Sequence, residues 1–162
     1  MARRQLVTFF VGTEFFGIDI LYVKEINRKV QITPIERVEP YVAGLINLRG
    51  QIVTIIDVRQ RLGLPFDEAA EHCIILKTNG EVRKRNDMST ADDLTSDDSI
   101  GLLVDGIGDV QSVDSDDCEA PPRESSDFES PFFDSVVQLD DRLLIVLDIR
   151  ELVAVQNVES NA

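Results

Sequence analysis

Histidine, cysteine and paired carboxylates are the side chains here that have the chemistry for catalysis or metal binding. His72 is the only histidine, and the side chain of its neighbour Cys73 would point to the opposite face of a strand, so the two are poorly placed to share a metal ion. Aspartate pairs occur at 92–93, 97–98 and 116–117, in polar sequence where nothing would raise a carboxyl pKa. We expect these pairs to form a solvated acidic surface.

Motifs that would hold a ligand fall short of their usual patterns. The glycines of DGIGDV at 105–110 do not complete a dinucleotide-binding fingerprint, and no GxxxxGK[S/T] phosphate loop is present. VDSDDCE at 113–119 lacks the glycine and the spaced final glutamate of a calcium loop. No GxSxG nucleophile motif occurs. We therefore expect no catalytic residue, no metal ion and no cofactor, and a protein that acts by binding.

Composition narrows the class of partner. The formal net charge of −14 would repel nucleic acid and anionic membranes. No apolar run approaches the about 20 residues that span a bilayer, so we expect a soluble, cytoplasmic protein without membrane insertion. Cys73 and Cys118 are expected to be free thiols in a reducing compartment, with a 73–118 disulfide as the alternative.

The local pattern is that of an all-β fold. Most apolar segments are short, rich in β-branched residues and bounded by Gly, Pro or Asp. Gln5–Val11 and Phe15–Ile20 flank Gly12-Thr13-Glu14, which predicts a hairpin. Residues 78–99 are highly charged with few apolar anchors and predict an extended loop, and residues 156–162 predict a flexible tail.

The chain contains an internal repeat. Residues 45–62, LINLRGQIVTIIDVRQRL, align without a gap with residues 136–153, VVQLDDRLLIVLDIRELV. A weaker pair, GIDILYVKEI at 17–26 and GLLVDGIGDV at 101–110, follows in the same order. Two copies of one unit imply two similar modules packed together, with a seam between them that is suited to holding a partner.

Each copy of the stronger repeat predicts two strands followed by a short helix. Asp57 and Asp148 stand at corresponding positions just before these helices, where an aspartate is a good N-cap. Arg59 and Arg150 repeat with them. We expect all four residues to be structural.

The run YVAGLINLRGQIVTIIDVRQRLGL at 41–64 closely resembles the signature of the CheW-like domain of bacterial and archaeal chemotaxis. The resemblance continues through FFGIDILYVKEI at 15–26, GLLVDGIGDV at 101–110 and LLIVLDIRELV at 143–153. It covers nearly the whole chain in the right order, so we interpret residues 1–162 as a single CheW-like domain.

The resemblance implies a fold of two tandem five-stranded β-barrels of the SH3/OB-like kind, joined back to back and carrying short helices. We assign approximately residues 15–77 to the first barrel. The second barrel takes residues 100–153 together with the N-terminal strand at 5–11. The loop at 78–99 is longer than the family core needs.

The resemblance also implies a function. Family members are non-enzymatic adaptors that link the cytoplasmic tips of methyl-accepting chemoreceptors to the regulatory domain of the histidine kinase CheA, which is itself CheW-like. They are recruited to membrane-associated receptor arrays, where ring contacts with other copies are also expected. The alternative is the same coupling role in a receptor–kinase pathway for surface motility or gene regulation.

Site residues follow from matching positions in the family. Receptor binding is expected at Val23, Glu25 and Arg49, where Val23 has a core position as its alternative. An arginine suits a forked bond to a carboxylate or carbonyl on a receptor helix. Kinase binding is expected at Ile32, Thr33, Ala43 and Gly44.

Two other classes of protein fit less well. A β-barrel that binds oligosaccharide or nucleic acid predicts a basic, aromatic face, whereas this chain has no Trp, two Tyr and strong negative charge. An enzyme would need a polar catalytic cluster outside the acidic segments, and the sequence contains none that we recognise.

Overall fold

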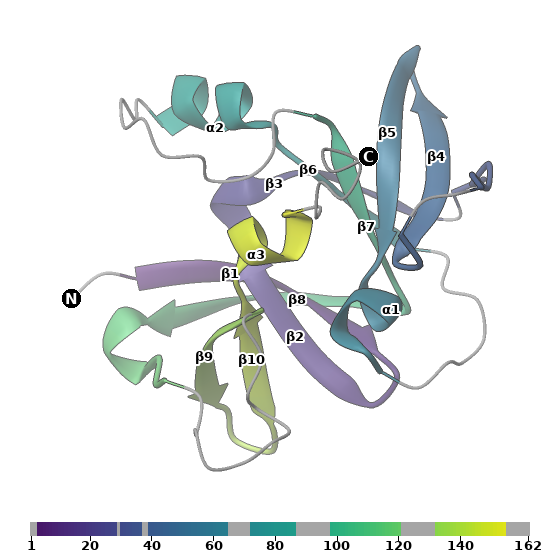
Figure 1. The fold of residues 1–162 in the computed structure, drawn as a ribbon. Coiled ribbons are helices and arrows are strands. Elements are labelled where there is room, and N and C mark those ends of the chain that lie inside the picture. Colours follow the sequence, from purple (N-terminus) through teal and green to yellow (C-terminus); the bar gives the residue numbers. More distant parts are fainter. Residues whose placement is uncertain are drawn as a thin grey trace.

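Two five-stranded sheets make up most of the protein (Figure 1). The structure is a computed structural model that describes residues 3–28, 30–36, 39–64, 72–86, 98–120 and 132–154. The predicted all-β class with two five-stranded units and short helices is confirmed.

We call the sheets A and B. Sheet A has the strand order β8 (Gly106–Asp114), β1 (Arg3–Val11), β2 (Glu14–Asp19), β10 (Leu143–Leu147) and β9 (Phe133–Gln138). Sheet B has the order β3 (Val23–Arg28), β6 (His72–Leu76), β7 (Ile100–Val104), β5 (Gln51–Asp57) and β4 (Val42–Leu48). The pairs β2–β10 and β5–β7 are parallel, and the other neighbours are antiparallel.

Each half of the chain contributes to both sheets. The first half gives β1 and β2 to sheet A and β3, β4 and β5 to sheet B, and the second half reverses this with β6 and β7 in B and β8, β9 and β10 in A. The predicted division, with 15–77 in one barrel and 100–153 plus 5–11 in the other, therefore misplaced β2 and β7. The pattern of apolar residues in a strand does not reveal which sheet the strand joins. The sequence therefore contained no local sign that β2 belongs to sheet A and β7 to sheet B.

The repeat is visible in the hydrogen bonds. The Asp57 N–H donates to the Tyr41 carbonyl at 2.7 Å, and the Asp148 N–H donates to the Phe132 carbonyl at 2.7 Å. Both aspartate side chains then accept backbone N–H groups at the start of α1 (Val58–Leu62) and α3 (Ile149–Val153). The predicted N-caps are confirmed.

Neither sheet closes into a hydrogen-bonded barrel within the described residues. The strands at the two edges of each sheet share no ladder, and one isolated bridge approximates closure instead. Thr33 pairs with Leu45 in sheet B, and Glu119 pairs with Val136 in sheet A. The predicted barrels are thus strongly curved open sheets.

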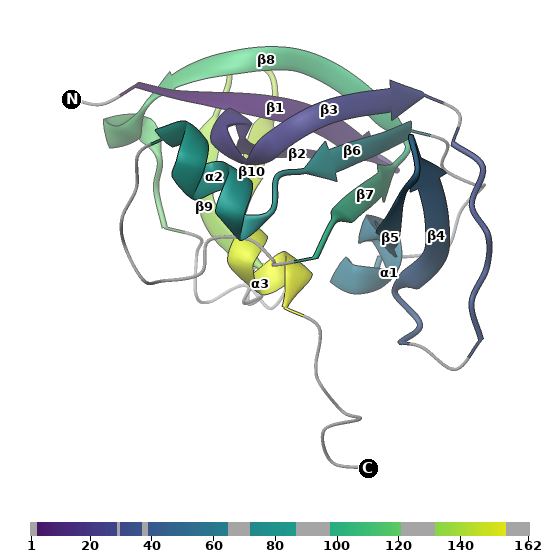
Figure 2. The same cartoon turned by 90° about the horizontal axis from the view of Figure 1, so that it is seen from above.

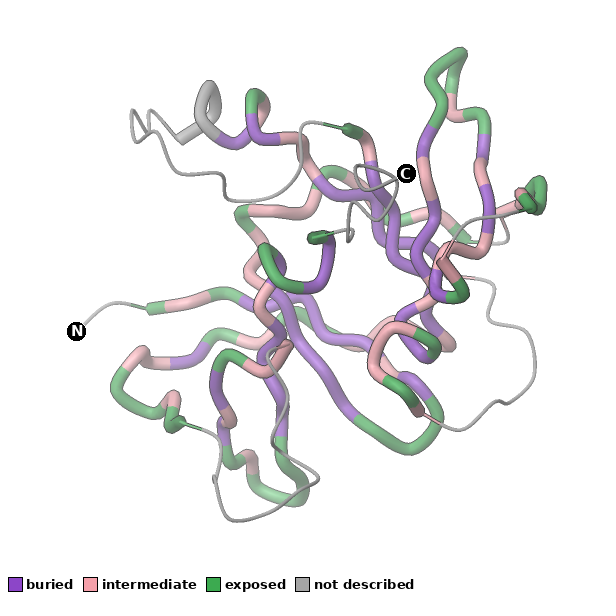
Figure 3. Tube along the Cα trace, viewed as in Figure 1, coloured by how far each residue is buried: buried purple, intermediate pink, exposed green. Residues whose placement is uncertain are grey.

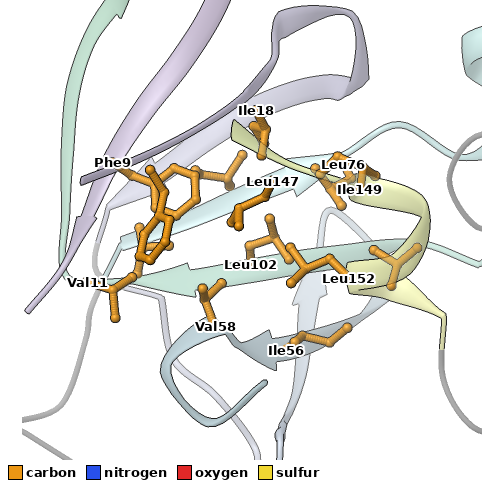
Figure 4. Packing of buried hydrophobic residues seen from close by; sticks show 14 of the residues in the cluster. Phe9, Val11, Ile18, Ile56, Val58, Leu76, Leu102, Leu147, Ile149 and Leu152 are labelled. Atoms are coloured by element: carbon orange, nitrogen blue, oxygen red, sulfur yellow. The ribbon is translucent and has the colours of Figure 1, made fainter. Parts of the chain in front are cut away.

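The largest hydrophobic cluster lies between the two sheets (Figure 4). Phe9, Ile18 and Leu147 come from sheet A, and Ile56 and Leu102 come from sheet B. Smaller clusters fill the inner face of each sheet. Figure 3 shows buried strand centres and exposed hairpin ends.

The segment predicted as an extended loop at 78–99 begins with helix α2 (Asn79–Asn86). Thr78 and Glu81 form a reciprocal capping box: the Glu81 carboxylate accepts the Thr78 N–H at 2.9 Å, and the Thr78 hydroxyl accepts the Glu81 N–H at 3.3 Å. Val82, on the same helix, is buried. The loop prediction is therefore wrong for this part: the high charge and few apolar residues suggested a loop, whereas Thr78 and Glu81 start a helix. Residues 87–97 and the predicted tail at 156–162 lie outside the described residues.

Candidate partner-binding site

The candidate site begins at the tight turn that joins β4 to β5. Arg49 and Gly50 have positive φ values of 52° and 85°, as the two central positions of a type I′ hairpin require. The Asn47 side chain accepts the Gly50 N–H at 2.9 Å, and Leu48 pairs with Gln51 across the turn. The sequence Asn-Leu-Arg-Gly thus fixes a turn from which the Arg49 side chain extends into solvent.

Arg49 forms an ion pair with Glu25. Glu25 lies on β3 and Arg49 follows β4, and these strands are opposite edges of sheet B, so the pair links the two edges. The Arg49 side chain is 68% exposed and the Glu25 side chain 25%. Because solvent screens such a pair, it adds under about 1 kcal/mol to stability. Both side chains can therefore exchange partners at little cost to the fold.

A groove of ≈ 580 Å³ lies beside this ion pair, between the two edges of sheet B. One wall comes from the end of β3 and the segment after it, and the other wall comes from β4. The residues lining it are Asn27, Val30, Gln31, Ile32, Thr33, Ile46, Asn47 and Leu48. Two of the predicted kinase contacts therefore line the same opening that the Glu25–Arg49 pair spans.

The four predicted kinase-binding residues lie together, although the sequence separates them. Thr33 and Leu45 exchange two backbone hydrogen bonds of 2.8 and 2.9 Å, which hold the 30–33 segment against β4. A Cβ on Gly44 would lie 2.2 Å from the Thr33 carbonyl oxygen and 2.7 Å from Ile32 Cγ2. Gly44 itself is buried, so its part is to admit this segment. Thr33 is exposed, whereas Ile32 and Ala43 are half-buried and pack against the smaller hydrophobic cluster of sheet B.

Val23 occupies an intermediate position. Its side chain is half-buried and packs against the central cluster, while its backbone pairs with Leu76 of β6. It lies two residues before Glu25 on the same edge strand. The structure therefore gives Val23 a core contact and leaves part of its surface exposed beside the ion pair.

Sequence reasoning missed two pairs of exposed apolar side chains. Ile26 on β3 and Val110 on β8 stand at corresponding positions of the weaker repeat and are 39% and 53% exposed. Ile52 near the start of β5 and Leu143 at the start of β10 correspond in the stronger repeat and are 58% and 45% exposed. The aligned repeat shows that both members of each pair are apolar, but it carries no signal that they are exposed.

Within the described residues, no three His, Cys, Asp or Glu side chains are grouped to hold a metal ion. Burial raises the pKa of the Cys73 thiol to about 12, which keeps it protonated and unreactive. Cys73 and Cys118 are free thiols. No helix of the described ranges is long and apolar enough to cross a membrane.

Comparison with known proteins places this architecture in a family. The family model described as the CheW-like domain matches residues 5–157. The chain belongs to the CheW-like family. It is 32% identical over 147 residues to the chemotaxis protein CheW of Rhizobium meliloti, which covers 90% of this chain and 84% of that protein. It is 31% identical over 164 residues to the chemotaxis protein CheW of Treponema pallidum, covering 98% of this chain and 86% of the relative.

A solved structure agrees with this assignment. The scaffolding protein TtCheW from Thermoanaerobacter tengcongensis superposes with a TM-score of 0.77 at 25% identity, covering 96% of this chain and 95% of that one. As a CheW-like family member, the chain is a non-enzymatic scaffold or coupling protein of the chemotaxis type.

Proposed function

We propose that this protein couples the cytoplasmic tips of chemoreceptors to the histidine kinase CheA. Receptor tips bind at Val23, Glu25 and Arg49, and the CheW-like regulatory domain of the kinase binds at Ile32, Thr33 and Ala43, with Gly44 shaping that surface. The protein works in the cytoplasm, recruited to membrane-associated receptor arrays, and carries out no chemistry of its own.

The observation that carries this proposal is that residues of both groups lie where the two edges of sheet B, β3 and β4, face each other. The Glu25–Arg49 pair spans the opening, and Ile32 and Thr33 line the ≈ 580 Å³ groove within it. Asn47 connects the two, because it lines the groove and also accepts the Gly50 N–H of the turn that carries Arg49. A partner that displaces Arg49 therefore acts next to the surface that the kinase domain contacts.

Two exposed apolar side chains, one on an edge strand of each sheet, support receptor docking. Figure 2 shows β8, β1 and β3 along one side of the molecule. Ile26 on β3 and Val110 on β8 are the exposed apolar residues of the two outer strands. An exposed apolar side chain on an edge strand of each sheet suits contact with the apolar stripe of a helical hairpin.

Coupling requires that each partner favour the same arrangement of the groove. Arg49 has two alternative acceptors, Glu25 in the free protein and a receptor carboxylate or carbonyl in the complex. If the groove has a different shape in these two states, the kinase domain binds one state more tightly than the other. Receptor binding then changes the affinity for the kinase domain, and kinase binding changes the affinity for the receptor by the same factor. Ile52 and Leu143, exposed on different hairpins, are candidate contacts for further copies in an array ring.

The test is a titration of the full chain against the CheA regulatory domain and a soluble receptor-tip fragment of the same organism, at low and high salt. Arg49→Ala should weaken receptor binding at least about tenfold, or about 1.4 kcal/mol, and leave kinase binding intact. Thr33→Lys should do the opposite. Arg142→Ala is the matched control, because this arginine sits on the corresponding hairpin of sheet A.

The outcomes separate function from location. If the wild-type chain binds no CheA regulatory domain from its genome, the coupling function is wrong. If Arg49→Ala and Arg142→Ala weaken receptor binding equally, the function stands but the receptor site does not lie at the opening of sheet B. High salt should weaken receptor binding more than kinase binding, because exposed charged contacts are screened.

A further inference from the structure

Arg61 of α1 lies between two aromatic rings from different halves of the chain. Its guanidinium carbon is 4.2 Å from the centroid of the Tyr41 ring and 4.7 Å from that of the Phe132 ring. A flat cation between two ring faces is favourable on both sides. The stronger repeat, extended four residues upstream without a gap, aligns Tyr41 with Phe132. Arg61 thus connects equivalent points of the two halves.

The same guanidinium also caps the C-terminal end of α3, the equivalent helix in the second half of the chain. The α3 carbonyls at its C-terminus receive three hydrogen bonds from Arg61, to Leu152 O at 3.0 Å, Glu151 O at 3.1 Å and Ala154 O at 2.7 Å. Helix α1 instead ends with its own Gly63 in the left-handed conformation, which α3 lacks because Ala154 is extended. Arg61 therefore supplies to α3 the donors that α1 obtains locally.

Arg61 is the member of its repeat pair that breaks the symmetry. The corresponding residue in the second half is Leu152, which is fully buried in the central cluster. One arginine consequently serves both halves. Its position next to Tyr41 and Phe132 is at the base of β4 and β9, since these strands begin at Val42 and Phe133.

The two hairpins that start here extend in opposite directions (Figure 1). The β4–β5 hairpin carries Arg49 and Ile52 near its turn, and the β9–β10 hairpin carries Leu143 near its own. A rotation at the common base displaces both turns. We propose that Arg61 is a positioning residue that fixes the orientation of the two hairpins relative to each other. In its consequence for signalling, the proposal rests on the function proposed above, because both turns belong to surfaces assigned there to partners.

The test measures the distance between the two turns without any partner. Spin labels are attached through Gln51→Cys and Asp140→Cys, two exposed turn positions. The background is Cys118→Ser, since Cys73 is fully buried and escapes labelling. Distance distributions are recorded by double electron–electron resonance for the parent, Arg61→Met and Arg61→Lys. Arg150→Met is the matched control, because it removes an exposed arginine from α3 itself.

We expect a single narrow distribution for the parent and for Arg150→Met, and a broadened or shifted one for Arg61→Met. Arg61→Lys should lie between them, since an ammonium keeps the cation between the rings but lacks the fork that reaches three carbonyls. If Arg61→Met does not fold, Arg61→Lys alone decides the outcome. A parent-like distribution in a folded Arg61 variant overturns the proposal whether or not the chain binds CheA.

The consequence for coupling is measured separately. Arg61→Met should bind the kinase regulatory domain and the receptor tip one at a time with parent affinity, and should lose stimulation of the kinase in the assembled complex. Equal stimulation by Arg61→Met and the parent would overturn the signalling consequence. A chain that binds no kinase at all would refute the proposed function and leave the distance result standing.

Discussion

The hairpin turns of the two sheets, between β4 and β5 in sheet B and between β9 and β10 in sheet A, align in the repeat but differ in conformation and in chemistry. The sheet B turn has two residues with positive φ, Arg49 and Gly50, between the paired Leu48 and Gln51, whereas the sheet A connection runs through four residues, 139–142, between the paired Gln138 and Leu143. In sheet B the turn residue Arg49 pairs with Glu25 across the opening. In sheet A the position of Arg49 is taken by Asp140, and Arg142 lies over Phe10 and Phe15, at 5.6 and 5.0 Å from their centroids. The two aligned hairpins have thus diverged at their turns, one of which carries an exposed ion pair and the other a cation over aromatic rings.

The chain passes from sheet A to sheet B between β2 and β3, and from sheet B back to sheet A between β7 and β8. These two crossings also differ in chemistry. Arg59 of α1 is buried and pairs with Asp105, where the chain passes from β7 to β8, and Asp105 also accepts the Gly12 N–H at 2.5 Å. The corresponding arginine in α3, Arg150, is exposed, and Leu21 replaces the aspartate. The β7–β8 crossing is held by the Arg59–Asp105 ion pair, whereas the β2–β3 crossing leaves Leu21 exposed next to β3, which carries proposed receptor contacts.

The largest loss of unfolding free energy should come from a substitution at the β-bulge that the edge strands β4 and β9 have in common. Gly44 and Ser135 correspond in the repeat, and each lies at a register shift with the neighbouring strand. Gly44→Ser should cost roughly 3–5 kcal/mol of unfolding free energy, because φ is 151° and a Cβ would meet the Thr33 carbonyl. Ser135→Gly should cost about 1 kcal/mol. Chemical denaturation measures both, and equal costs would mean that the 30–33 segment does not press on Gly44.

The next effect tests the difference between the crossings. Arg59→Met leaves Asp105 without its buried partner and should cost roughly 2–3 kcal/mol, somewhat less than for a fully enclosed pair because Asp105 is partly exposed. Arg150→Met should change the unfolding free energy by under about 0.5 kcal/mol. Thermal and urea unfolding of the two variants settle the comparison. Similar losses in both would show that Arg150 has a structural contact equal to that of Arg59.

How much of this the sequence could predict depends on whether a feature is local. The hairpin at Gly12, the helices after Asp57 and Asp148 and the duplication were all predicted, since turn residues, caps and aligned repeats are local patterns. The exchange of β2 and β7 between sheets was not, because it depends on which partners two equally apolar strands find. Helix α2 was missed although Thr78 and Glu81 are a recognisable capping box.

The candidate site divides along the same line. Resemblance to a family pointed to Glu25 and Arg49 as separate contacts, and only the curvature of sheet B brings them together as an ion pair. Gly44 was predicted as a contact and is buried under the 32–33 segment, because a glycine's role depends on what packs against it. Val110 and Leu143 were overlooked because an apolar residue in a strand pattern is expected to be buried. The exposure of Val110 comes with its place on the edge strand β8, and that of Leu143 with its place at the hairpin end of the inner strand β10.

The smallest effect concerns the cap of α1. Burial raises the pKa of the Asp57 carboxyl and Asp105 adds to this, while hydrogen bonds from the Gln60 and Arg59 N–H groups and the Arg59 charge act against it. A raised folded-state pKa means that the unfolded chain loses its proton first. Stability should therefore fall as the pH rises from the ordinary carboxyl value of about 3.9 through the raised one, and stay lower above it.

Asp57→Asn keeps an N-cap acceptor and removes this titration. The variant should match or exceed the parent by up to about 1 kcal/mol at pH 7, and the advantage should disappear at pH 3, where the parent carboxyl is protonated in both states. Urea unfolding at the two pH values measures it, with Asp148→Asn as the same chemical change at the cap of α3. A variant less stable than the parent at pH 7 but equal at pH 3 would show that the ionised carboxylate stabilises α1. The stabilisation from its hydrogen bonds and from the Arg59 charge would then exceed the free-energy cost of burying it.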